Sequence, residues 1–396
     1  MEENLELHHY PRYSVFNIFN KKRGLLLIGN NNKINKREKN PGIELLRLLG
    51  MYAIIVHHVL LFGNTFKKYK HFKVVFLMNI LCFWHVSSYA LISGIVGYKT
   101  YKYSNLLYLW ISTVFYSVVI YLYYKRYHPM YFENHTLIES LFPVIFHKYW
   151  YFTAYFGMYL FIPLINKGLS VVNKKELKII VVSIFGIFII LKDFIKSKFD
   201  PFGLKRGYSV LNLIIFYILG AYLGKYVIKG NKNKSIFYYL ICLLVYISSS
   251  LLCYYFCCFF NKEKAKIKIL INVSQLFTLR INSFAMILQV ISLTLIFTQI
   301  KYNKIFGKIV SCLGPYTYGV YISHCNEYFI NFEFIKIFEN YSEFTPLNTI
   351  VYLVNIRSIQ IYILCIFIDY IRYLFFKILK IREICIFIDK QINNLF

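Results

Sequence analysis

Long hydrophobic stretches alternate with short polar segments along nearly the whole chain. A helix that crosses about 30 Å of hydrocarbon needs roughly 20 mostly apolar residues. Stretches of this kind lie at 42–62, 72–97, 104–124, 149–166, 177–195, 209–228, 236–260, 282–300, 309–330 and 348–378. Gly and polar residues interrupt 149–166 and 309–330, so about eight or nine spans are the alternative. The pattern predicts an all-α polytopic membrane protein with about ten transmembrane helices.

The composition fits this class of protein. The 396 residues are 58% hydrophobic, 20% aromatic and only 16% charged, which excludes an ordinary soluble enzyme. The formal net charge is +28, but the basic residues cluster between apolar stretches and form no nucleic-acid recognition module. The nine cysteines lie mostly in apolar stretches without C-x-x-C spacing, so we expect small buried side chains and no metal site.

The distribution of charge indicates the orientation. With the N-terminus inside the cell, Lys and Arg are more numerous on cytosolic than on external segments, which predicts that both termini are cytosolic. The chain then divides into a polar, basic cytosolic tail (1–40), one transmembrane domain (41–381) and a cytosolic C-terminal tail (382–396). Nothing before Pro41 resembles a cleavable signal, so we expect the first span to direct insertion into a bacterial cytoplasmic membrane.

The first span contains ionisable side chains, which are costly in hydrocarbon and therefore suggest a function. Arg47 and His58 are three helical turns apart, about 16 Å along the axis, and share one face. Glu44 precedes Arg47 by one turn and can pair with it, whereas His57 points about 80–100° away. The alternative is that Arg47 extends to the membrane surface and the histidines only satisfy helix contacts.

Three further stretches contain polar groups. Ser93 and Gly94 end the second span, where small residues allow close approach of a helix or a ligand. The segment 149–166 combines an aromatic belt, including Tyr155, with polar edges. His324 is expected toward the external end of 309–330, either as a structural hydrogen-bonding group or as a site residue.

Together these stretches resemble acyltransferase family 3, the integral membrane acyltransferases that include bacterial polysaccharide O-acetyltransferases. The resemblance covers the chain from Pro41 to about Ile381. It rests on five ordered matches: Glu44, Leu46-Arg47 and His58 in the opening helix; Ser93-Gly94 with Tyr98; Trp150 to Asn166; Tyr217 to Tyr222; and Tyr318 to His324.

The resemblance implies transfer of an acyl group, most simply acetyl from cytosolic acetyl-CoA, to a hydroxyl of a cell-surface or lipid-linked glycan. Attack on a thioester needs a base for the hydroxyl proton and positive charge near the developing oxyanion. His58 is the expected base, Arg47 the group that holds the donor or stabilises charge, and Glu44 the group that orients Arg47. Direct transfer and a covalent acyl-histidine intermediate both stay open.

Ser93, Tyr155 and His324 are the expected substrate-binding residues. Many family members place paired arginines after the second span. Here Lys99 and Lys102 are available to attract the phosphates of acetyl-CoA, although without bidentate geometry. The expected partners are the lipid bilayer, a glycan acceptor and polysaccharide biosynthesis machinery, with no nucleic acid and no metal.

A second hypothesis is a transporter of polysaccharide or lipid-linked glycan, in which the Arg, Glu and His side chains relay protons. Dependence on coenzyme A discriminates between the two, because a carrier should not transfer acyl groups from acetyl-CoA. A catalytically dead structural subunit is a third hypothesis, against which the intact Arg47 and His58 argue.

Overall fold

The computed structural model describes residues 40–68, 72–98, 101–132, 137–195, 199–228, 234–260 and 268–395. Every regular element in these residues is helical, which confirms the predicted all-α class. Six helices are long and apolar enough to cross a membrane. They are α1 (Pro41–Phe62), α3 with α4 (Phe72–Cys82 and His85–Gly97), α5 (Tyr103–Tyr127), α10 with η4 (Val210–Tyr222 and Leu223–Val227), α11 (Ile236–Cys258) and α17 (Leu347–Ile378).

The other four predicted spans are also helical but less continuous. They are α7 (Trp150–Val171), which contains Pro163; α8 with η2 and α9 (Lys174–Phe185, Gly186–Leu191 and Lys192–Phe194); the shorter α13 (Phe284–Gln299); and α14, η5 and α15 (Lys304–Leu313, Gly314–Tyr316 and Thr317–His324). The break between α14 and α15 falls at Pro315, which has no N–H for a helical hydrogen bond. The count of ten spans and the cytosolic placement of the termini stay predictions.

Short helices fill most of the connections and the C-terminal end. They are α2 (Thr65–Lys68), η1 (Pro129–Phe132), α6 (Leu137–Leu141), η3 (Lys205–Gly207), α12 (Lys268–Leu276), α16 (Glu327–Phe329), η6 (Ile330–Phe334), η7 (Ile335–Phe338) and α18 (Ile381–Leu395).

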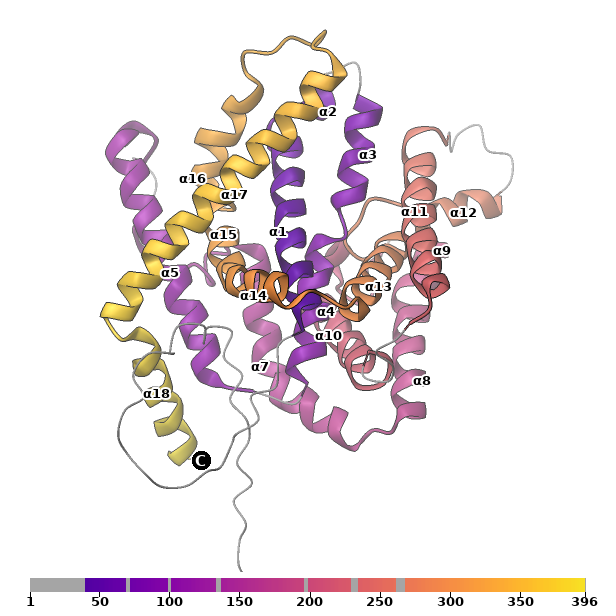
Figure 1. Cartoon of the computed structure of the whole chain (residues 1–396), viewed down its shortest axis with the longest axis horizontal. Helices are drawn as coiled ribbons and strands as arrows, with labels where there is room; N and C mark the ends of the chain where they lie inside the picture. Colours follow the sequence, from indigo (N-terminus) through magenta and orange to yellow (C-terminus); the bar gives the residue numbers. More distant parts are fainter. Residues whose placement is uncertain are drawn as a thin grey trace, which may run out of the picture.

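Helix α1 lies at the centre of the bundle, between α4, α13, α14 and α17 (Figure 1). It begins where the Asn40 side chain accepts a hydrogen bond from the Gly42 backbone N–H, with Pro41 in the first turn. Helix α17 is 32 residues long, about 48 Å, so it must tilt to fit a bilayer core of about 30 Å. Figure 1 shows it running diagonally across the molecule to α18 at the lower left.

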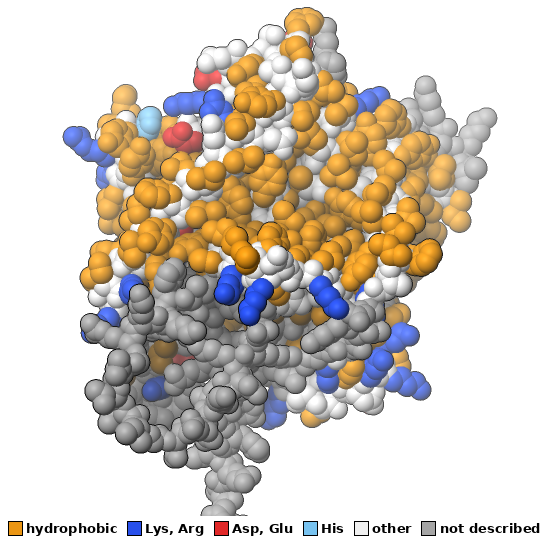
Figure 2. All heavy atoms as spheres, in the orientation of Figure 1, with side chains coloured by type: hydrophobic (Ala, Val, Ile, Leu, Met, Phe, Trp, Pro, Cys, Tyr) orange, Lys and Arg blue, Asp and Glu red, His pale blue; other side chains and the backbone are white. Residues whose placement is uncertain are grey.

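The outer surface of the bundle is apolar. On the face that Figure 2 shows, hydrophobic side chains form a broad band across the molecule, and most Lys and Arg side chains lie below it or near its upper edge. Exposed side chains such as Leu244 on α11 and Phe367 on α17 belong to the candidate membrane spans. This distribution is typical of a multi-pass membrane protein, whose helices face lipid as well as each other.

Glycines bring α4 and α10 into backbone contact. A Cβ atom on Gly94 would lie 2.0 Å from the carbonyl oxygen of Tyr217, and one on Gly220 would lie 2.0 Å from that of Leu91. Small residues allow such close helix packing inside a membrane. The predicted role of Gly94 in close approach is confirmed, and the contacting group is a helix backbone.

A buried ion pair fixes α15 against α17 and α5. Asp369 accepts hydrogen bonds from Arg372 at 2.7 Å and from the Tyr116 hydroxyl at 2.7 Å. Gly319 of α15 packs so closely on this carboxylate that any Cβ there would overlap it. Because Asp369 is fully buried, its charge is tolerable only when it is paired and hydrogen-bonded.

We predict that Gly94→Ala destabilises the protein by about 1–3 kcal/mol, because the added methyl group meets a backbone that cannot rotate away. Thermal unfolding of the protein in detergent, followed by intrinsic fluorescence, measures the effect as a lower Tm. Gly168→Ala in α7 is the matched control, since nothing lies within 4 Å of its Cβ position. An unchanged Tm for Gly94→Ala would show that α4 and α10 are further apart than described.

Candidate active site

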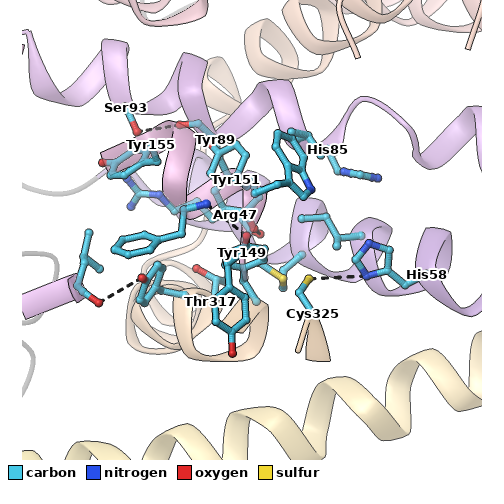
Figure 3. A pocket seen from close by; sticks show the side chains of 18 of the residues that line it. Arg47, His58, His85, Tyr89, Ser93, Tyr149, Tyr151, Tyr155, Thr317 and Cys325 are labelled. Atoms are coloured by element: carbon cyan, nitrogen blue, oxygen red, sulfur yellow. Dashed lines mark hydrogen bonds between the residues drawn. The ribbon is translucent and has the colours of Figure 1, made fainter. Parts of the chain in front are cut away.

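A cavity of about 330 Å³ lies beside α1 and is lined mainly by residues of α1, α4, α5, α7 and α15. Figure 3 shows Arg47, Ser93 and Tyr155 on one side of the view and His58 with Cys325 on the other. Arg47 and His58 are three turns apart on α1, about 16 Å, so the cavity follows the helix axis. We call its two ends the arginine end and the histidine end.

At the arginine end, Arg47 donates from Nη1 to the Glu44 carboxylate at 2.6 Å. This confirms the predicted pairing one turn apart on α1. The Tyr89 hydroxyl donates to the Arg47 carbonyl oxygen at 2.6 Å and so joins α4 to α1. Glu44 is buried and does not itself line the cavity, whereas Arg47 does. The arrangement presents a guanidinium to a ligand and keeps its counter-charge behind it.

At the histidine end, three side chains from α1 and the end of α15 converge. The Cys325 Sγ atom lies 3.7 Å from His58 Nδ1 and 3.4 Å from His324 Nε2. His58 and Cys325 line the cavity, while His324 is fully buried behind Cys325 and does not. His324 therefore lies behind the cavity wall, in contact with Cys325 and with the His58 ring.

These three groups could also hold a metal ion, because their ligand atoms all lie within 4.8 Å of one another. Two imidazoles and a thiolate are ligand types that zinc accepts. The sequence predicted no metal, and that prediction is not tested by the geometry alone.

Two further histidines lie close to His58, with the ring centroid of His57 5.5 Å from that of His58. His57 Nδ1 is 2.6 Å from the side-chain oxygen of Asn79, and His85 packs against His57 with ring centroids 5.5 Å apart. Both line the cavity. The sequence predicted that His57 points away from the site. It lines the cavity nevertheless, because α4 forms the cavity wall next to His57.

His85 has an unusual environment. Its side chain is 2% exposed, and both of its ring nitrogens lack a hydrogen-bond partner among the described residues. A buried polar group left unsatisfied costs about 1–3 kcal/mol, so such groups commonly mark a ligand site. His85 was not among the residues predicted from the sequence. It is an ionisable side chain inside a predicted span, which is the same feature that indicated His58.

The remaining predicted residues are partly brought together. Ser93 and Tyr155 both line the cavity at the arginine end. Lys99 lies outside the described residues. Lys102 does not line the cavity, but its carbonyl oxygen accepts a hydrogen bond at 3.1 Å from Tyr159, which does.

Arg382 of α18 is a cavity residue that the sequence did not indicate. It donates to the Ser104 carbonyl oxygen at 3.3 Å and to the Asn105 side-chain oxygen at 2.6 Å, just beyond Lys102. No ion pair joins it to a carboxylate in the described part of the chain, and burial lowers the pKa of its guanidinium. A C-terminal segment that alternates apolar and charged residues gave no reason to place this side chain at a site.

Lys148 is a further charged residue of the cavity wall. It lines the cavity and pairs with Glu139 at 2.5 Å and Glu327 at 2.6 Å. Burial by itself would lower the pKa of this ammonium group, but the two carboxylates raise it above the ordinary lysine value. Lys148 therefore stays protonated, and the two carboxylates balance its positive charge.

Apolar helices around an internal cavity with charged and titratable side chains define an integral membrane protein with a buried ligand site. Residues 40–373 match the family model described as an acyltransferase domain, and the chain belongs to acyltransferase family 3. It is thus a multi-pass membrane acyltransferase. Comparisons with curated proteins and with solved structures gave no match.

We predict that Arg47→Lys retains only part of the acyltransferase activity, because lysine keeps the charge but loses the planar fork that binds in two directions. The rate per amount of membrane-inserted protein measures the effect. Arg357→Lys, at an exposed position of α17, is the matched control and should remain fully active. Normal activity of Arg47→Lys would mean that Arg47 only anchors α1 at the membrane surface.

Proposed function

We propose that this protein transfers acetyl from acetyl-CoA to a hydroxyl of a cell-surface or lipid-linked glycan. The observation that carries the proposal is one cavity with a guanidinium at one end and an imidazole cluster at the other. An anionic donor suits the first end, and proton transfer suits the second. In the proposed orientation the arginine end opens toward the cytosol of a bacterial cell, where acetyl-CoA is made.

The distance between Arg47 and His58 along α1 favours one of the two roles that the sequence left open for Arg47. Side chains on a helix tilt in the same direction, so Arg47 and His58 stay well over one side-chain length apart across their roughly 16 Å separation. A group at the arginine end cannot contact the carbonyl at which His58 acts as base. Arg47 therefore binds acetyl-CoA in this proposal. The oxyanion is stabilised by a hydrogen-bond donor near His58. His85 is suited to this, because its ring nitrogens are unpartnered.

Many family members have paired arginines after the second span, where this chain has lysines. In the proposed donor site Arg382 provides a guanidinium in their place. It lies beside the segment that contains Lys102 and is not neutralised by an ion pair with a described carboxylate. A planar fork can grip a phosphate in two places, and lysines add only point charge. The proposed donor site thus combines Arg47, Arg382, Lys102 and Lys99, while Ser93 and Tyr155 contact the substrate between the two ends.

The central test compares the two adjacent histidines of α1. His58→Ala should abolish acetyl transfer, since losing a general base costs about 10²–10⁴ in rate. His57→Ala should leave most of the activity, because His57 contacts Asn79 and not Cys325. Transfer of radiolabelled acetyl from acetyl-CoA to surface glycan measures both, with protein levels matched.

Both substitutions remove the same atoms at nearly the same depth, so each is the control for the other. Equal and mild losses would remove His58 as the base. Wild-type protein that transfers no acetyl from acetyl-CoA would refute the proposed donor and favour the transport hypothesis.

A second test concerns the donor end. Arg382→Ala should raise the KM for acetyl-CoA about tenfold or more, the cost of losing a hydrogen bond to a charged group, with little change in kcat. Lys390→Ala is the matched control, an exposed cation on the same helix. A lower kcat with an unchanged KM would place Arg382 away from the donor.

A further inference from the structure

The histidine end contains the thiol of Cys325, which has no role in the function proposed above. Of the nine cysteines, all of which are described, Cys325 alone lines the cavity. It directly follows α15, and Figure 3 shows it turned toward His58. Its sulfur is the only hydrogen-bonding contact that the described residues offer to the His58 side chain.

The tautomer of a neutral His324 ring follows from its backbone contact. His324 Nδ1 lies 2.6 Å from the carbonyl oxygen of Val320, and a carbonyl oxygen can only accept. In the neutral ring, Nδ1 therefore carries the proton and Nε2 carries a lone pair, 3.4 Å from the Cys325 sulfur. One imidazole thus orients the thiol from behind, and the other stands in the cavity beside it.

A separate observation indicates that a polar ligand enters this end. His85 lines the same cavity and is nearly fully buried, with no hydrogen-bond partner for either ring nitrogen among the described residues. Its packing against His57, the neighbour of His58 on α1, places it at the histidine end. A ligand carbonyl or hydroxyl bound here could form a hydrogen bond with His85. The ligand would then lie in the same cavity that Cys325 lines.

We propose that Cys325 carries the acyl group as a thioester between the donor and the acceptor. In the first half-reaction the S–H of Cys325 rotates from His324 to His58, which accepts the proton while the sulfur attacks the carbonyl carbon of acetyl-CoA. The new carbon–sulfur bond forms, the bond to the CoA sulfur breaks, and the proton passes from His58 to the departing CoA thiolate. One thioester replaces another, so the step needs no further reactant.

In the second half-reaction the acceptor hydroxyl attacks the acyl-Cys325 carbonyl. His58 takes the hydroxyl proton, the carbon–Sγ bond breaks, and the proton returns to the sulfur. The products are the acetylated acceptor and the free thiol. A cysteine activated by a neighbouring base is an established type of covalent nucleophile. His324 is a positioning residue here, because it contacts the sulfur and not the substrate.

This inference rests on the proposed acetyl-CoA donor, and the test separates the two. The full-length protein in detergent is incubated with radiolabelled acetyl-CoA without acceptor, denatured and analysed by peptide mass spectrometry. We expect an acetyl group on Cys325 that neutral hydroxylamine removes, as it does from thioesters. We also expect ping-pong kinetics when an acceptor is added.

Cys325→Ala should lose the label and at least about 10² of the transfer rate, and Cys325→Ser should lose the hydroxylamine-sensitive label while it elutes as folded protein in size exclusion. Cys312→Ala, a half-buried cysteine outside the cavity, is the matched control and should keep both. Transfer at the wild-type rate by Cys325→Ala, with His58→Ala inactive, would overturn the acyl-cysteine and leave the proposed function in place.

Metal content gives a second way to overturn the inference. If the purified protein holds one equivalent of zinc that His58→Ala, His324→Ala and Cys325→Ala each lose, the thiol is a metal ligand and cannot carry the acyl group. If wild-type protein transfers no acetyl from acetyl-CoA at all, the proposed function fails and the acyl-cysteine fails with it.

Discussion

The structure depends on one constraint: ionisable side chains inside apolar helices must find partners within the protein. Arg47 meets this constraint through Glu44, and Arg372 through Asp369 with the Tyr116 hydroxyl. Each pair joins or orients helices that surround the cavity. The groups that lack such partners, above all His85, are therefore informative, because an apolar surround makes an unpaired polar group expensive.

The cavity exists because the helices around it are packed tightly at some positions and interrupted at others. Glycines let the backbones of α4 and α10 touch, which sets the wall that contains Ser93 and His85. The break at Pro315 lets α14 and α15 take different directions, and Gly319 seats α15 on Asp369. Together these features deliver Cys325, the residue after α15, to the face of α1 that carries His58.

Membership of acyltransferase family 3 shows the class of reaction, and the cavity suggests how its two ends divide the work. The proposed anionic donor and hydroxyl acceptor have opposite requirements, positive charge for the first and a proton acceptor for the second. Because the two ends are about three helical turns apart, one cavity can meet both requirements at different places. A thiol at the histidine end provides a group that can receive the acyl from one side and release it to the other.

The sequence by itself determined what is local. Hydropathy predicted the helical membrane class, and the one-turn spacing predicted the Glu44–Arg47 pair. Periodicity could not say which helix faces meet, so it missed His85, Cys325 and Arg382 and treated His57 as pointing away from the site. His85 reaches the cavity from α4, Cys325 from the position after α15, and Arg382 from α18. Only tertiary packing decides such contacts, because a helix specifies its own faces and not the residues, far along the chain, that will cover them.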